Sequence, residues 1–474
     1  MVSALNRPPM SRSTTFAFAG ANLPVMAIAL AISVYLPKYF ASNIGVSLAA
    51  VGGAFALVRL IDIPLDPLLG MAMDRTRTRI GRYRLWMLIG TPILLVSIHR
   101  LFLPPPGITE VYLIGWLLMM YVGFSIIVLA HSAWASTLSK TYDERTRLFA
   151  AMTAVGVGGQ ACVLLAPLLL KELGYSETAG VQGMGWFIIA ATPVAVALML
   201  WRTPEYVAPA SAAHPHFRLK DYVALVTQPD MARILAADLC LSLGPGCMSA
   251  LYLFFFTASR GFTLGQASLL LLVNILVGFV GAPAMGKLAT RIGKHRATMV
   301  ACAGFGAMMA TLMAIPQGDM VVAIPIMLAF GFFSSGFVVL TRAMVADVSD
   351  LMRLEQGQER AGLLFALTTL TSKVAGALSI FLTYQLLARI GFDARAGAAN
   401  TREAIHAMEL VYLITPTSFV LLGGACFIGY RLTAARHAVI RRDLDLRDAA
   451  IQGEAEHMAA LTGEPLALRR PSEV

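Results

Sequence analysis

The sequence has few charged residues for its length, and this scarcity decides its class. Only 14% of the 474 residues are Asp, Glu, Lys or Arg, whereas 57% are hydrophobic and the mean hydropathy is +0.71. A soluble protein of this length needs more polar side chains to cover its surface. The composition therefore excludes an ordinary soluble domain and indicates a protein whose surface lies largely in lipid.

Cysteine is also scarce, and motifs for covalent chemistry are missing. The five cysteines stand singly in apolar surroundings without a CxxC pair, which predicts neither a disulfide framework nor a metal site. The sequence has no nucleophile motif and no phosphate-binding loop, so we expect no enzyme, no cofactor and no ATP-driven mechanism. The polar start leads into a full-length apolar segment without an AxA site, so we expect no cleavable signal.

Apolar runs of about 20 residues recur from end to end, the length at which a helix crosses a ~30 Å hydrocarbon core. We predict an all-α polytopic membrane protein with twelve transmembrane helices in two six-helix halves. The polar, Pro- and Ala-rich break at 203–230 gives a first half 1–202, a linker 203–230, a second half 231–432 and a tail 433–474. The expected spans are 15–37, 45–69, 85–104, 109–135, 148–170, 184–201, 231–257, 264–286, 297–315, 320–343, 361–388 and 406–430.

The basic residues are distributed unevenly between the two sides of the membrane. The net charge of +10 resides in short loops, not on one soluble face, so we expect the lipid bilayer and no nucleic acid as partner. The termini and the loops after even-numbered spans are Lys- and Arg-rich, which predicts cytoplasmic termini in a bacterial-type inner membrane. The side opposite these Lys- and Arg-rich loops has only Lys38, Arg100, Lys171, Arg260, Arg389, Arg395 and Arg402, while Arg59 and Lys373 fall within spans. We expect the protein to be a monomer.

Arg59, Asp62 and Asp66 lie inside the second expected span. Their spacing of three and four residues places them on one helix face. A charged side chain near the bilayer centre costs roughly 2.5–3.5 kcal/mol, so three of them need partners or a polar cavity. Two carboxylates four residues apart converge on one point and suit a hard cation such as Na⁺, or they share a proton. These three residues therefore form a charged stripe that indicates ion handling inside the membrane.

Two similar turns follow the second span of each half. The chain reads GMAMDRTRTRIGRYR after span 2 and GKLATRIGKHR after span 8. A glycine followed by a basic turn at equivalent places is what a repeated six-helix unit leaves. These turns and the six-plus-six spans resemble the major facilitator superfamily. We expect Gly70 to allow close helix packing. The cytoplasmic gate is then expected at Gly70, Asp74, Arg75, Arg79 and Arg82.

Further motifs narrow the resemblance to the glycoside–pentoside–hexuronide:cation symporters, the melibiose permease family. R-x-x-D-x-x-x-D-P-x-x-G at 59–70 is similar to that family's signature, and D-E-R-T-R at 143–147, A-D-V-S-D at 346–350 and T-S-K at 371–373 match other segments. The resemblance implies that Asp62 and Asp66 bind the coupling cation and that Lys373 opposes them from the second half. It also extends the gate to Asp143, Arg147 and Asp347. The alternative is a static ion-pair cluster that only holds the bundle together.

The sugar contacts typical of that family are depleted here. Span 1 has Asn22 and no acid, and spans 4 and 5 offer His131, Ser132, Trp134 and Gln160 in place of an acid and an arginine. A sugar is usually held by charge-assisted hydrogen bonds and an aromatic platform, which Trp134 could provide. We predict a cation-coupled symporter, driven by Na⁺ or H⁺, for a sugar- or glycoside-like solute. An exporter of an amphipathic or drug-like solute and a membrane sensor remain the alternatives.

A few polar or helix-breaking positions have two interpretations each. His131 is either a proton carrier in the coupling machinery or a packing residue. Asp238 in span 7 either lines the substrate cavity or is a helix N-terminal charge. Gly244-Pro245-Gly246 either breaks span 7 at a transport site or only kinks it. Asn274 in span 8 is a weaker candidate for the substrate cavity, which is also expected to include Asn22, Trp134 and Gln160.

Overall fold

The computed structural model describes residues 10–138, 142–205, 228–356 and 361–462, and the regular elements in these ranges are all helical. The first half begins with one interrupted span, made of α1 (Arg12–Gly20), α2 (Asn22–Leu30), η1 (Ala31–Tyr35), α3 (Leu36–Tyr39) and η2 (Phe40–Ile44). Its other helices are α4 (Leu48–Arg75), α5 (Arg82–Phe102), α6 (Glu110–Leu138), α7 (Tyr142–Glu172) and α8 (Glu177–Arg202).

The second half has the same order of long helices, followed by a C-terminal helix. It comprises α10 (Pro229–Phe254) with η3 (Phe255–Ser259), α11 (Leu264–Ile292), α12 (Lys294–Leu312), α13 (Met320–Ser334), α14 (Gly336–Gln356), α15 (Ala361–Arg389), α16 (Arg402–Ala425) and α17 (Ala434–Thr462). Together α13 and α14 form one span, because only Ser335 separates them.

The expected all-α membrane architecture is confirmed. In the described ranges eleven segments are long and apolar enough to cross a membrane. The remaining expected span, 297–315, is α12, which starts with the basic residues of the turn before it and falls outside that set. It packs against α13 and α16 like a member of the bundle, so twelve long helical segments of the described ranges form the two halves.

The glycines around Pro245 pack helices together. Helix α10 continues through Gly244-Pro245-Gly246 without a break. Gly244 lies against Pro416 and Val420 of α16, and Gly246 lies against Ser379 of α15. Because a side chain at either position would collide with these neighbours, the small residues serve close packing and not an unwound site.

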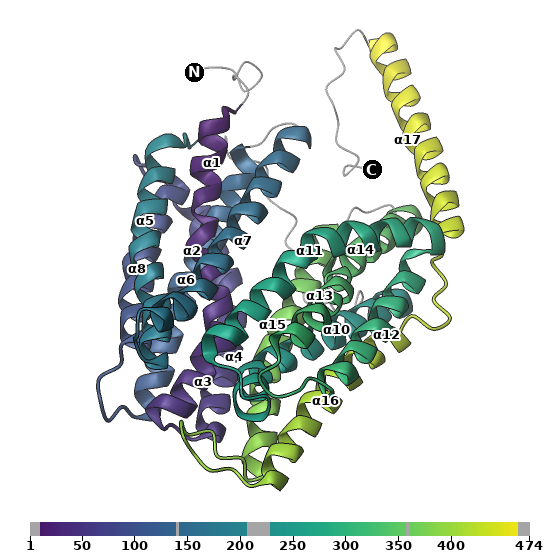
Figure 1. Ribbon diagram of the computed structural model, residues 1–474. Helices are drawn as coiled ribbons and strands as arrows, with labels where there is room; N and C mark the ends of the chain where they lie inside the picture. The colour runs from purple at the N-terminus through teal and green to yellow at the C-terminus, as the bar shows by residue number, and fades with distance from the viewer. Residues whose placement is uncertain (1–9, 139–141, 206–227, 357–360, 463–474) are drawn as a thin grey trace.

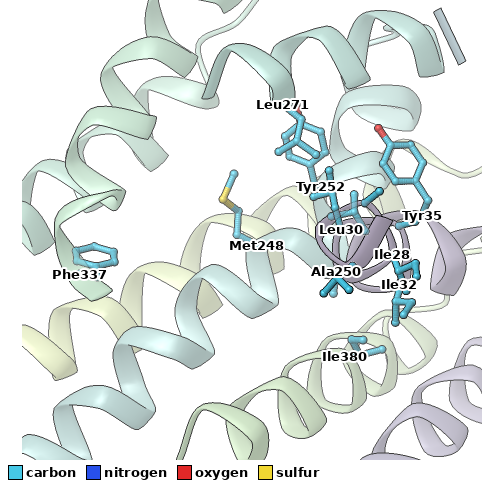
Figure 2. Packing of buried hydrophobic residues seen from close by; sticks show 14 of the residues in the cluster. Ile28, Leu30, Ile32, Tyr35, Met248, Ala250, Tyr252, Leu271, Phe337 and Ile380 are labelled. Carbon is cyan, nitrogen blue, oxygen red and sulfur yellow. The ribbon is translucent and has the colours of Figure 1, made fainter. Parts of the chain in front are cut away.

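The two halves form two bundles that meet along part of their length (Figure 1). Helices α4 and α15 pack together, as do α7 and α11, and these pairs join the halves. Figure 2 shows the apolar side of the contact, where residues of the first span lie beside α10 and α15. Tyr35 and Tyr252 are among its largest fully buried side chains. The core therefore runs across both halves.

One end of the bundle is closed and the other is not. We call the end with the turn 76–81 and Gly293 the basic end, and the end with Gly45, Gly174 and Gly261 the far end. Hydrogen bonds between the halves gather at the far end, where Tyr35 Oη bonds Ser268 Oγ at 2.7 Å and Ala396 N donates to Ser42 O at 2.9 Å. At the basic end the bundles diverge (Figure 1).

Candidate functional site

Helix α4 carries the charged stripe and is locally weakened beside it. Ser47 caps its N-terminus by accepting from Ala50 N at 3.2 Å, and Pro64 and Pro67 lie inside the helix. A proline has no N–H to donate, so the carbonyls four residues earlier lose their helical partner. Those carbonyls belong to Leu60 and Ile63.

Asp62 is the most enclosed charge of the stripe, with a fully buried side chain. Its Oδ2 accepts from Lys373 Nζ at 2.8 Å and from Arg59 Nη1 at 3.3 Å. Its Oδ1 accepts from Ser125 Oγ of α6 at 2.9 Å. Every oxygen of this carboxylate is thus engaged, as a buried charge requires.

Asp66 lies one turn further along α4 and is only partly satisfied. Its Oδ2 pairs with the same Lys373 ammonium at 2.5 Å. Its Oδ1 is buried and has no hydrogen-bond partner in the described part of the chain. An unsatisfied buried carboxylate oxygen is costly and marks a position where a further donor or cation is favoured.

The charges of this site balance across the two halves. Arg59 and the two aspartates come from α4, whereas Lys373 comes from α15 of the second half. The Arg59 guanidinium also stacks over the ring of Tyr121 at 4.2 Å. Two cations therefore face two anions, and the ammonium of Lys373 sits where both carboxylates can reach it. This arrangement places the four predicted residues together.

The carboxylates offer a site that Lys373 and a small cation would share. Hard cations take oxygen ligands, and the oxygens present are those of the two carboxylates and of the Ser125 hydroxyl. Sequence reasoning missed Ser125, because a lone serine in an apolar span gives no signal until α6 is known to face α4. Since Lys373 belongs to the other half, its exchange for a cation would change how the halves are held together.

His131 and Trp134 lie away from the charged stripe. His131 Nε2 is 3.0 Å from the carbonyl oxygen of Phe18, and the two rings are 4.4 Å apart. Trp134 is fully buried, packs edge-on against Phe18 and points its Nε1 toward Pro204 O at 3.4 Å. Both side chains are thus engaged inside the first half, and in this conformation the indole is closed to a solute.

The other predicted cavity residues have separate positions. The Asn22 amide donates to Met152 O of α7 at 2.7 Å, which ties two helices of the first half together. Asn274 faces Gly331 of α13, so it lies in a helix contact. Gln160 is half-buried. Asp238 is half-buried on α10 and accepts a hydrogen bond from Thr371 Oγ1, two residues before Lys373.

The basic turn of the first half is held by an interaction that the sequence did not suggest. Arg82 pairs with Asp74 and donates through Nε to Met73 O at 2.7 Å. The carboxylate of Glu205, just after α8, accepts three backbone hydrogen bonds. The donors are the N–H groups of Arg82 at 2.6 Å, Tyr83 at 2.8 Å and Arg84 at 3.1 Å. A carboxylate at the N-terminus of α5 also complements the helix dipole.

The remaining residues of the predicted first-half gate do not form contacts between helices here. The position of Gly70 has open space where a side chain would extend, in contrast to the close packing we expected. The adjacent side chains of Leu68 and Met71 are exposed, so this stretch of α4 lies at the surface of the helix bundle. Arg75 and Arg79 are exposed, and so is Arg147. The side chain of Asp143 lies outside the described residues.

Asp347 anchors the corresponding turn in the second half. Lys294, the first residue of α12, donates to both Asp347 oxygens at 2.6 and 2.7 Å. His437 of α17 lies 3.4 Å from the same carboxylate and 3.0 Å from Asp350. The tail helix is therefore tied to the predicted A-D-x-x-D segment, a contact that the sequence did not predict.

Comparisons with known proteins agree on one family and one fold. The profile of the family described as MFS/sugar transport protein matches residues 17–434. The uncharacterized symporter YjmB of Bacillus subtilis is 25% identical over 87% of this chain and 90% of its own. The glucuronide carrier protein homolog of Escherichia coli is 24% identical over 88% and 91%. The crystal structure of the nucleoside transporter NupG is 12% identical, with a TM-score of 0.65 over 89% of this chain and 99% of that one.

Proposed function

The chain belongs to the MFS/sugar transport protein family, and on that premise we propose that it is a symporter that couples Na⁺ or H⁺ to the movement of a sugar-like solute. The carrier class follows from the family, which consists of transporters and not enzymes. The solute class rests on the relatives, among them the glucuronide carrier protein homolog. The coupling ion rests on the charged stripe of α4.

The single observation that carries the coupling proposal is the position of Lys373. Its ammonium lies 2.8 Å from Asp62 and 2.5 Å from Asp66 and thereby bridges α15 of the second half and α4 of the first. A coupling cation would take the place of that ammonium between the carboxylates. Lys373 would then be released toward the second half, and the contact between α4 and α15 would change with ion occupancy.

This competition gives a physical route from ion binding to alternating access. With Lys373 in place, the site is neutral and the halves are linked at mid-membrane. With a cation in place, Lys373 loses its partners, and the solute can provide new ones. The halves then rock about the central cavity, as is general for carriers built from repeats. A static ion-pair cluster would show the same contacts but would not respond to the cation.

The orientation of the carrier follows from its basic loops. We place the basic end in the cytoplasm of a bacterial-type inner membrane, with both termini on that side, because Lys and Arg accumulate in cytoplasmic loops. In this orientation the far end is extracytoplasmic and the structure is open toward the cytoplasm. We expect a monomer, since all four charges of the ion site come from one chain.

Solute uptake into proteoliposomes tests the proposal. Vesicles with an imposed inward Na⁺ or H⁺ gradient would be offered a panel of radiolabelled glycosides, pentosides and hexuronides. We expect one ion to drive accumulation of at least one solute. Asp62→Asn and Asp66→Asn should each abolish accumulation, whereas the matched control Asp445→Asn, an exposed aspartate on α17, should not. Accumulation that survives both substitutions would contradict the ion site.

A further inference from the structure

The tail helix α17 docks on α14 through one continuous face. It rises from the basic end of the second half (Figure 1) and packs against α14. His437, Arg441 and Asp448 are spaced by four and seven residues, so they share one side of the helix. Ile440 and Leu444 on the same side are buried. The first turns of the tail are therefore a docked element of the second half.

The docking contacts are made by charged side chains. His437 Nε2 is 3.0 Å from Asp350 Oδ2, and Arg441 Nη1 is 3.4 Å from Asp350 Oδ1. Further along, Arg353 Nη2 donates to the two oxygens of Asp448 at 3.1 and 3.0 Å. Every ion pair that joins α17 to another helix in the described part of the chain goes to α14. These contacts tie the tail to the basic end of one transmembrane helix.

Asp350 is the acid that the tail occupies. Both of its ion-pair partners in the described ranges, His437 and Arg441, come from α17. In contrast, Lys294 of α12 donates to both oxygens of the nearby Asp347 at 2.6 and 2.7 Å. The Asp350 side chain keeps an exposure of 26%, so another cation can reach it once the tail moves away. The availability of this carboxylate therefore depends on the tail.

The first half presents uncovered positive charge at the same end. Five arginines there are exposed and have no ion pair among the residues that the structure describes, namely Arg75, Arg77, Arg79, Arg145 and Arg147. The facing turn of the second half, GKLATRIGKHR, is basic as well. These two surfaces approach each other when the basic end closes, and like charges brought together across an interface are costly. Closure therefore needs acids between them, and Asp350 is placed to be one.

We propose that α17 is an autoinhibitory element. By binding Asp350 it keeps from the first half an anion that closure of the basic end requires, and so it holds the carrier open toward the cytoplasm. Undocking of the tail releases Asp350 to the arginines of the first half and lets the basic end close. This role rests on the proposed alternating access, but it does not depend on the solute, on the coupling ion or on the site at Asp62 and Asp66.

Labelling of a cysteine at position 42 from outside reports how often the far end opens, which in alternating access accompanies closure of the basic end. Ser42 is buried here, and its carbonyl oxygen accepts from Ala396 N of the second half at 2.9 Å. Right-side-out proteoliposomes with Ser42→Cys would receive a membrane-impermeant maleimide without solute, and labelling of the native cysteines would be subtracted. Adding His437→Gln and Arg441→Gln should accelerate labelling about threefold, the size expected for partly exposed ion pairs.

Two further variants make the test specific. Arg442→Gln is the matched control, because this neighbouring arginine is exposed and pairs within α17 itself, and it should leave labelling unchanged. Asp350→Asn loosens the tail but also removes the acid that the first half needs, so it should not accelerate labelling. Acceleration by Asp350→Asn as large as that of the tail variant would mean that the tail acts as a steric wedge, and it would overturn the competition for Asp350.

Unchanged or slower labelling in the tail variant would also overturn the proposal. Arg441→Gln alone, at a half-exposed position, should act in the same direction and guards against a folding defect of the double variant. Labelling that stays at background in the parent and in every variant would contradict alternating access and the role of the tail together. Equal labelling above background in the parent and the tail variant would contradict the role of the tail alone.

Discussion

Replacement of Lys373 by methionine should strengthen cation binding at Asp62 and Asp66 even without solute. Methionine has a similar length and no charge, so the variant removes the ammonium from between the carboxylates with little change in volume. The site then keeps two acids and one base, Arg59, and its excess negative charge favours Na⁺ or a proton. A cation no longer has to displace a tethered competitor.

The magnitude follows from the two ion pairs that are lost. Removing one partner of a buried ion pair typically costs 3–5 kcal/mol. Lys373 and Asp66 retain side-chain exposures of 19% and 22%, so solvent screens part of the interaction and the lower end of that range applies. If the cation no longer has to break these ion pairs, its binding free energy becomes more favourable by about 3 kcal/mol, which corresponds to roughly hundredfold tighter binding. The same loss of contact should weaken the link between α4 and α15.

Binding to the purified protein is the assay. Titration calorimetry with Na⁺ at fixed pH, and proton uptake measured with a pH-sensitive dye at fixed Na⁺, would be compared between the parent and Lys373→Met. One of the two ions should bind about a hundredfold more tightly in the variant. Lys171→Met serves as the charge-matched control. If both ions bind equally well or more weakly after removal of Lys373, the competition between lysine and cation is refuted.

Three smaller substitutions test other contacts. Ser125→Ala should weaken cation binding about threefold to tenfold, since one hydrogen-bonding group contributes about 0.5–1.5 kcal/mol, and the same titrations check this. Glu205→Gln should lower the midpoint of thermal unfolding, because the carboxylate that holds three N–H groups of α5 loses its charge; an unchanged midpoint would argue against that role. His131→Gln should retain gradient-driven uptake, since the ring contacts Phe18 and not the stripe; loss of coupling in a stable variant would make it a proton carrier.

The architecture could be predicted well from the sequence, because a run of apolar residues long enough to cross a membrane as a helix is recognised from neighbouring residues alone. Each expected span corresponds to a helical segment, although some ends differ widely, as where the span expected at 320–343 continues to Gln356. Charges spaced by three and then four residues identified one face of α4. Lys373 could be paired with that face only through the family resemblance, since 311 positions separate it from Asp62.

Contacts that depend on how helices face one another were not predictable. Trp134 offers a polar edge and an aromatic face in sequence, yet its side chain is fully buried, and Phe18 of α1 packs edge-on against it. Ser125 and Glu205 gained importance only from the helices placed opposite them. Gly70 is a motif glycine that has no close neighbour in the described part of the chain, and the side chains of Leu68 and Met71 beside it are exposed.

The most direct test of the account is the simultaneous measurement of solute and cation entry in the same proteoliposomes. Downhill solute influx should carry Na⁺ or H⁺ with it, read from ²²Na⁺ uptake or from a trapped pH dye. In Asp62→Asn this accompanying cation flux should vanish, while solute exchange at equal concentrations on both sides continues. Solute influx without any accompanying cation, or an undiminished cation flux in Asp62→Asn, would contradict the role of the α4 carboxylates in coupling.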